Sequence, residues 1–94
     1  MDVIIKLIAL GSTRDDDLYT EVYASLQPVT RAEFSAAGQA GYHTIRRFDV
    51  WSSEYADQEE VLYEGRRLTV YRVYGPKPDG RSELYTAERV GNRG

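Results

Sequence analysis

The stretch that decides the fold is YASLQPVTRAEFSAAGQAGY, residues 23–42, in which an alternating strand is followed by a helix start and a run of small residues. Thr30 and Glu33 match a capping box. In that motif the hydroxyl accepts from a free amide of the first helical turn, and the glutamate bonds back to the amide of the capping residue. The pattern therefore predicts a short helix that begins at Arg31.

Small residues follow this helix start. Gly38 and Gly41 lie where a chain that leaves a helix often needs a positive φ, so we expect about two helical turns and then a flexible tip. Mobile loops on a rigid β scaffold often carry function. The sequence thus indicates that this segment has a functional role.

The remainder of the chain has the alternation and turn residues of short strands. Pro28 cannot donate to a sheet ladder, so the strand before it should end there or lie at an edge. The strand that starts at Tyr42 has an ambiguous inner face, which a bulge near Arg46-Arg47 would reconcile. Glu64-Gly65 is a two-residue turn of the kind found in hairpins. The predicted strands span 2–9, 18–29, 42–51, 61–63, 66–74 and 82–90.

Five or six short strands with one brief helix predict a mainly β fold. The expected architecture is a small antiparallel β-barrel or half-open sandwich, with the helix and a long loop between strands 2 and 3. Residues 1–94 are expected to form one domain, with a disordered tail over 91–94. The acidic segment 52–60 is expected to be a surface connection.

Composition excludes several classes of function. The formal net charge is −3, whereas proteins that bind nucleic acid usually carry a basic surplus. The chain has no cysteine, which excludes disulfides and thiolate metal sites. The apolar run 3–10 is too short to span a bilayer and lacks the flanks of a signal peptide. No association with a membrane is therefore expected.

Residues that could support catalysis are sparse. His43 is the only histidine and has no nucleophile or second ligand beside it in sequence. Asp15-Asp16-Asp17 lacks the ligand spacing of a calcium loop, and residues 38–41 lack the lysine of a phosphate-binding loop. We therefore expect no enzyme activity, no cofactor and no metal.

Charged and aromatic side chains suggest ordinary structural roles. The pairs Arg46-Arg47 and Arg66-Arg67 are expected to form cross-strand ion pairs. Phe34 could pack inward against the barrel, which is the outcome expected from the residues alone, or anchor a partner through its aromatic area. Trp51 is expected in the core or at its rim. The acidic partners considered for the arginines are Glu54, Glu59, Glu64 and Glu83.

The order of these motifs resembles the phage head-tail joining family, also called head-tail adaptor or head-closure proteins. The matching segments are YASL at 23–26, VTRAEF at 29–34, AAGQ at 36–39, TIR at 44–46, VLYEGRRLTV at 61–70 and EL at 83–84. The resemblance covers most of the chain from Tyr19 onward. It implies a structural virion protein of a tailed phage or prophage, present in the host cytoplasm during assembly.

Members of that family form a ring at the head-tail connector, which closes the packaged head and docks the tail. The implied partners are the portal or connector adaptor, a tail completion protein and further copies of the chain, while DNA passes through without specific binding. Glu33 and, less strongly, Asp49 are candidates for facing the DNA channel. The residues expected to face a partner or the channel are Thr30, Arg31, Glu33, Phe34, Gly38, Gln39 and Gly41.

Two other classes of function remain open from the residues. A barrel that binds single-stranded nucleic acid would need a basic, aromatic-lined face, and the eight tyrosines supply only the aromatic half. A small enzyme or ligand carrier would need converging polar groups in a pocket. The single histidine and the absence of cysteine argue against that third class.

Overall fold

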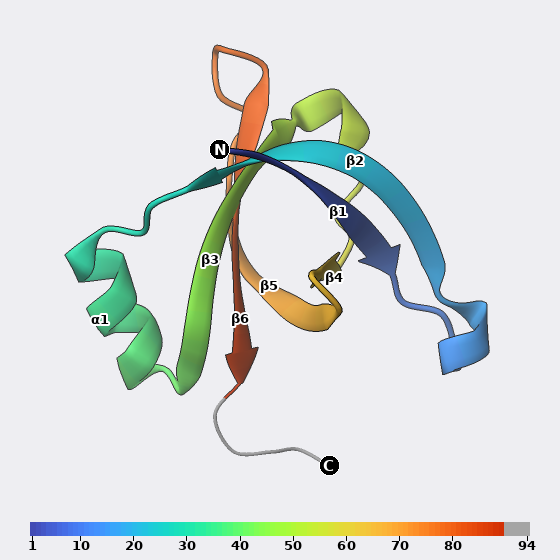
Figure 1. Cartoon of the computed structure of the whole chain (residues 1–94), viewed down its shortest axis with the longest axis horizontal. Helices are drawn as coiled ribbons and strands as arrows, with labels where there is room; N and C mark the ends of the chain where they lie inside the picture. Colours follow the sequence, from blue (N-terminus) through green and yellow to red (C-terminus); the bar gives the residue numbers. More distant parts are fainter. Residues whose placement is uncertain (90–94) are drawn as a thin grey trace.

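A computed structural model describes residues 1–89, and in it six antiparallel strands close into a barrel with one α-helix outside it (Figure 1). The barrel, rather than the half-open sandwich, is therefore the form adopted. The tail predicted over 91–94 lies outside the described residues. Among these, no helix is long or apolar enough to cross a bilayer.

The strands follow one another around the barrel in the order β1-β2-β3-β6-β5-β4, and β4 pairs with β1 to close it. The two short 3₁₀ turns are η1 (Arg14–Asp16) and η2 (Ser52–Glu54), and the helix α1 (Arg31–Gln39) lies between β2 and β3. The strands are β1 (Asp2–Ala9), β2 (Leu18–Gln27), β3 (Tyr42–Trp51), β4 (Glu60–Tyr63), β5 (Arg66–Tyr74) and β6 (Arg81–Arg89).

The barrel interior is filled by alternate residues of the strands, as the period of two requires. Phe48 is fully buried, and the ring of Tyr63 packs against it edge-on, with centroids 5.1 Å apart. The predicted turn at Glu64-Gly65 is confirmed, since both residues have the positive φ of a tight hairpin. The other buried core residues are Ile5, Leu7, Val22, Ala24, Val50, Val61, Leu68 and Leu84.

A bulge in β3 separates two small cores. The register with β6 shifts between His43 and Arg46, and Thr44 has a φ of 55°. The prediction of a bulge near Arg46-Arg47 is confirmed, and the extra residue lies just before Arg46. The shift turns Ile45 away from the barrel interior and toward α1, while Phe48 stays inside.

The contact between β2 and β3 is short. Only Ser25, Leu26 and Gln27 pair with β3, opposite Asp49, Phe48 and Arg47. β2 ends at Gln27, directly before Pro28, which confirms the predicted end of the strand. The chain then leaves the barrel toward α1 (Figure 1). Residues 42–46 of β3 are thus left without a strand partner on the β2 side.

Candidate partner-binding groove

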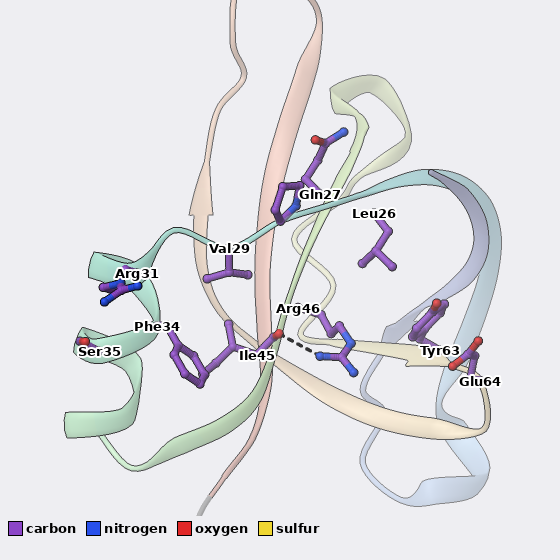
Figure 2. A pocket seen from close by; sticks show the side chains of 11 residues that line it. Leu26, Gln27, Val29, Arg31, Phe34, Ser35, Ile45, Arg46, Tyr63 and Glu64 are labelled. Atoms are coloured by element: carbon purple, nitrogen blue, oxygen red, sulfur yellow. Dashed lines mark hydrogen bonds between the residues drawn. The ribbon is translucent and has the colours of Figure 1, made fainter.

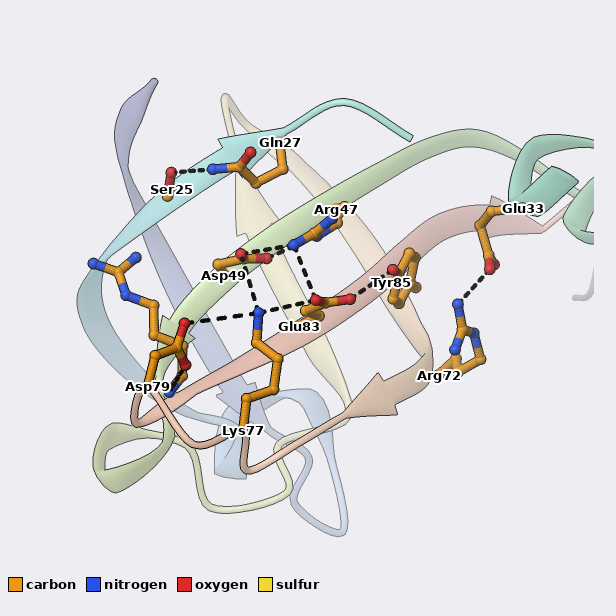
Figure 3. A network of polar contacts seen from close by, with 11 residues as sticks. Ser25, Gln27, Glu33, Arg47, Asp49, Arg72, Lys77, Asp79, Glu83 and Tyr85 are labelled. Atoms are coloured by element: carbon orange, nitrogen blue, oxygen red, sulfur yellow. Dashed lines mark hydrogen bonds and ion pairs between the residues drawn. The ribbon is translucent and has the colours of Figure 1, made fainter. Parts of the chain in front are cut away.

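Helix α1 begins where the sequence predicts. Thr30 is extended, with φ −68° and ψ 158°, and its Oγ1 accepts from the backbone amide of Glu33 at 3.1 Å. The reciprocal half of the predicted capping box is not formed. Instead the Glu33 carboxylate accepts a 2.6 Å hydrogen bond from the Tyr71 hydroxyl on β5. It also pairs with Arg72 on the same strand (Figure 3). The glutamate therefore anchors the helix to the barrel.

This anchor shifts two pKa values in opposite directions. Burial alone would raise the pKa of Glu33, but hydrogen bonds from Tyr71 and Arg72 and the charge of Arg72 outweigh it and lower the pKa. Burial, and then the bond to the carboxylate, raises the pKa of Tyr71 well above its ordinary value. Glu33 is thus a paired carboxylate, which argues against its expected role as a free charge facing a channel.

The far end of α1 is more ordered than the sequence suggested. The helix continues to Gln39, the amide of Ala40 bonds to the Ala36 carbonyl at 3.1 Å, and β3 starts at Tyr42. The predicted length of about two turns is confirmed, but Gly38 and Gln39, which were predicted to lie in the loop after the helix, are helical. Only Gly41, with φ 91°, has the predicted positive φ.

One buried residue seats the helix on the barrel. Ala37 is 3% exposed and packs with Ile45 and Ala87, and Tyr42 and Tyr71 border this cluster. The two tyrosine rings are stacked with centroids 4.5 Å apart. A small contact of this kind holds α1 in place but leaves most of its surface uncovered.

Phe34 lies on that uncovered surface. It is 59% exposed, so the expectation that it packs inward is wrong. Its ring borders an open groove of about 1170 Å³ between α1 and the mouth of the barrel (Figure 2). The groove is lined by Leu26, Gln27, Pro28, Val29, Arg31, Phe34, Ser35, Ile45, Arg46, Tyr63 and Glu64.

Two arginines in this groove have no carboxylate partner within residues 1–89. Arg31 is exposed at the first position of α1, where the helix dipole disfavours a cation. Arg46 donates to the carbonyl of Ile45 at 3.2 Å and extends beside Tyr63 (Figure 2). Glu64 also lines the groove but forms no ion pair with either arginine. The groove therefore combines apolar side chains with two unneutralised guanidinium groups.

The predicted site residues separate into three groups. Thr30 and Glu33 cap and anchor α1, while Arg31 and Phe34 border the groove. The third group lies at the other end of the helix and does not line the groove; it comprises Gly38, Gln39 and Gly41. Sequence reasoning did not assign Arg46, Tyr63 and Glu64 to the site; Tyr63 and Glu64 reach the groove only because β4 closes the barrel against β1.

Of the two arginine pairs predicted to form ion pairs, only Arg46 forms none within residues 1–89, so the prediction is wrong for that residue. Ion pairs are formed by Arg47, Arg66 and Arg67. Arg47 bonds to both Asp49 oxygens at 2.9 Å and to Glu83 at 3.0 Å, and Lys77 reaches Glu83 at 2.9 Å (Figure 3). Asp49 is 6% exposed, so the suggestion that it faces a channel is wrong. Burial alone would raise the pKa of Glu83, but its bonds and the neighbouring cations lower it.

The second arginine pair is also neutralised. Arg67 binds Asp17 at 3.0 Å and Glu60 at 2.6 Å, and Arg66 pairs with Glu88. Of the partners expected from the sequence, only Glu83 pairs with an arginine. Trp51 lies at the rim, half exposed, with the guanidinium of Arg81 over its ring at 4.4 Å.

The described part of the chain offers little for catalysis or metal binding. His43 is exposed at the start of β3. Residues 1–89 contain no cluster of three or more histidine or acidic side chains placed to hold a metal ion. No protein-family model, curated protein or solved structure matches this chain. The functional proposal is therefore based on the geometry of the groove and of α1.

Proposed function

We propose that this protein is a structural component of a tailed phage or prophage, one of several copies in a ring at the head-tail connector. In this role it closes the packaged head and provides a surface on which the tail docks. Its partners are the portal or connector adaptor and a tail completion protein, and DNA passes through the ring without specific binding. The motif order from residue 23 to residue 84 supports the proposal.

The observation that carries the proposal is the exposed apolar and basic face around Phe34. A phenylalanine at 59% exposure beside a groove of about 1170 Å³ is typical of an anchor for a protein partner. The helix that carries it is attached by the Glu33 anchor and by Ala37, so the backbone at Phe34 is already positioned. A backbone segment that is ordered before binding loses less entropy when a partner binds.

Co-expression with the connector proteins of the same gene cluster tests the proposal. We expect the chain to co-purify with the portal or adaptor and to form a ring in electron micrographs. Replacing Phe34 with serine should abolish co-purification without lowering the melting temperature. The matched control is Tyr23→Ser, since Tyr23 is also largely exposed but lies on β2 outside the groove. A gene cluster without portal and capsid genes, or normal binding by Phe34→Ser, would contradict the proposal.

A single-stranded nucleic-acid-binding barrel remains the second candidate. Phe34 and Tyr63 lie in one groove with Arg31 and Arg46, and stacking on aromatic rings combined with basic groups is how such barrels bind. The acidic net charge opposes this function. Fluorescence anisotropy with a labelled oligonucleotide at low salt distinguishes the two candidates. Salt-sensitive binding that Phe34→Ser removes would favour the nucleic-acid function.

A further inference from the structure

The groove beside α1 has a complement on the same chain. The connection from η2 to β4, residues 52–59, contains Glu54, Asp57 and Glu59 and no lysine or arginine. All three side chains are exposed, and within residues 1–89 none of them forms an ion pair. We call residues 52–59 the acidic connection. The acidic connection thus has carboxylates that form no ion pair, and the groove has two guanidinium groups that form none, within residues 1–89.

The acidic connection has a fixed shape. Gln58 is 8% exposed, and its Oε1 accepts from the amide of Ala56 at 2.7 Å. The Tyr55 hydroxyl donates to the Gln58 carbonyl at 2.9 Å, and Asp57 is held at a φ of 60°. These contacts present the carboxylates on an ordered surface, which lowers the entropy cost of docking.

The groove and η2, where the acidic connection begins, lie toward opposite ends of β3. Ile45 and Arg46, near the start of β3, line the groove, whereas η2 follows Trp51 at its end (Figure 1). Within residues 1–89 no carboxylate of the acidic connection pairs with Arg31 or Arg46, so the molecule's own acidic connection does not occupy its groove. A second copy, placed head to tail, can supply it.

We propose that the acidic connection of one copy docks in the groove of the next, with its carboxylates against Arg31 and Arg46. This inference rests on the proposed function and deepens it, because it names the contact between neighbouring subunits. A contact between different surfaces of identical copies closes into a ring when the rotation between neighbours permits. Exposed ion pairs are individually weak, so isolated copies associate weakly and a connector that gathers them favours the ring.

Disulfide cross-linking of purified protein tests the contact, because the native chain has no cysteine. Ser35 lines the groove and Ser53 lies in the acidic connection, and both are exposed. We would mix Ser35→Cys and Ser53→Cys under diamide at about 0.5 mM, where a contact with a millimolar Kd is substantially populated. The matched control replaces the second variant with Ser12→Cys, an exposed serine in the turn between β1 and β2.

The first pair should yield about fivefold more heterodimer than the control pair, as expected for a preferred contact over random collision. Combining Arg31→Glu and Arg46→Glu with Ser35→Cys should reduce the yield to the control level. A variant that combines Glu54→Lys and Glu59→Lys with Ser53→Cys should restore the heterodimer yield when it is mixed with that groove variant. Raising the salt to about 0.5 M should also reduce the yield of the original pair, since salt screens exposed charges.

Equal yields from the two pairs, or a yield that neither charge reversal nor salt changes, would overturn the contact. Protection of Ser35→Cys from alkylation by an oligonucleotide, without heterodimer, would also overturn it, in favour of nucleic acid. The assay contains no connector protein. Failure of cross-linking with normal connector binding therefore rejects only the contact, whereas cross-linking without connector binding rejects the proposed function.

Discussion

Replacing Glu33 with glutamine should weaken the attachment of α1 while leaving its N-terminal cap intact. Thr30 accepts from the backbone amide of residue 33, which the substitution keeps. The Tyr71 hydroxyl retains an acceptor, but a hydrogen bond to a neutral group is weaker than one to a carboxylate by about 1 kcal/mol. The pair with Arg72, whose side chain is 46% exposed, adds only about 0.5 kcal/mol. The expected loss of unfolding free energy is about 1.5 kcal/mol.

Urea denaturation followed by circular dichroism measures this loss. For a domain of this size it corresponds to a fall in Tm of about 6–12 °C. The Glu33 pKa is lowered in the folded state, so its contribution is complete above its ordinary value of 4.5 and is lost as the pH falls through the folded value. The gap between wild type and Glu33→Gln should therefore be constant from about pH 6 to 8 and should shrink below about pH 4.5.

The control removes the same charge from a more exposed pair. Glu88→Gln breaks the ion pair with Arg66, whose side chain is 64% exposed, and should cost less than about 0.5 kcal/mol. A Glu33→Gln variant within about 0.3 kcal/mol of wild type at pH 7, or a gap unchanged at low pH, would refute the anchoring role. In that case Ala37 alone would hold the helix.

Three further predictions concern stability. Replacing residues 31–39 with a Gly/Ser linker should lower the free energy of unfolding by about 3 kcal/mol, because packing on Ile45 and the Glu33 contacts are lost. Circular dichroism should still show a folded barrel. An unfolded variant would mean that α1 belongs to the core. Phe48→Ala should cost about 3–5 kcal/mol in urea denaturation, because the side chain is fully buried; a loss below about 1 kcal/mol would contradict this. Arg47→Met should lower the free energy of unfolding by about 2–4 kcal/mol, because Asp49 would be buried without its main partner. Lys77, 3.9 Å from Asp49, should compensate in part. An unchanged melting curve would argue against the role of the pair.

The sequence predicted most of the fold because the relevant signals are local. Alternation and turn residues located the strands, and Thr30 located the start of α1. The helix length of about two turns was predicted, but Gly38 and Gln39 were assigned to the loop that follows. Glycine in a helix costs only about 1 kcal/mol relative to alanine, and Ala37 is held by tertiary packing.

The candidate site was predicted only in part because its other half depends on long-range pairing. The partners of Glu33 come from β5, where a register shift between Val70 and Arg72 accommodates Tyr71. A capping box gives no sign that its glutamate will bond elsewhere. Tyr63 likewise reaches the groove only because β4 closes the barrel against β1. No spacing along the chain encodes either contact.

Pro28 links the fold to the proposed interface. β2 pairs with β3 only through residues 25–27, so β2 does not cover the edge of β3 beside Ile45 and Arg46. The pairing stops just before Pro28, and the chain turns outward to Thr30, where the helix starts. The gap left in the barrel wall is bordered by Pro28 on one side and Arg46 on the other. The groove is thus a direct consequence of where the ladder ends, and it places the two unpaired arginines where an acidic surface of another copy can reach them.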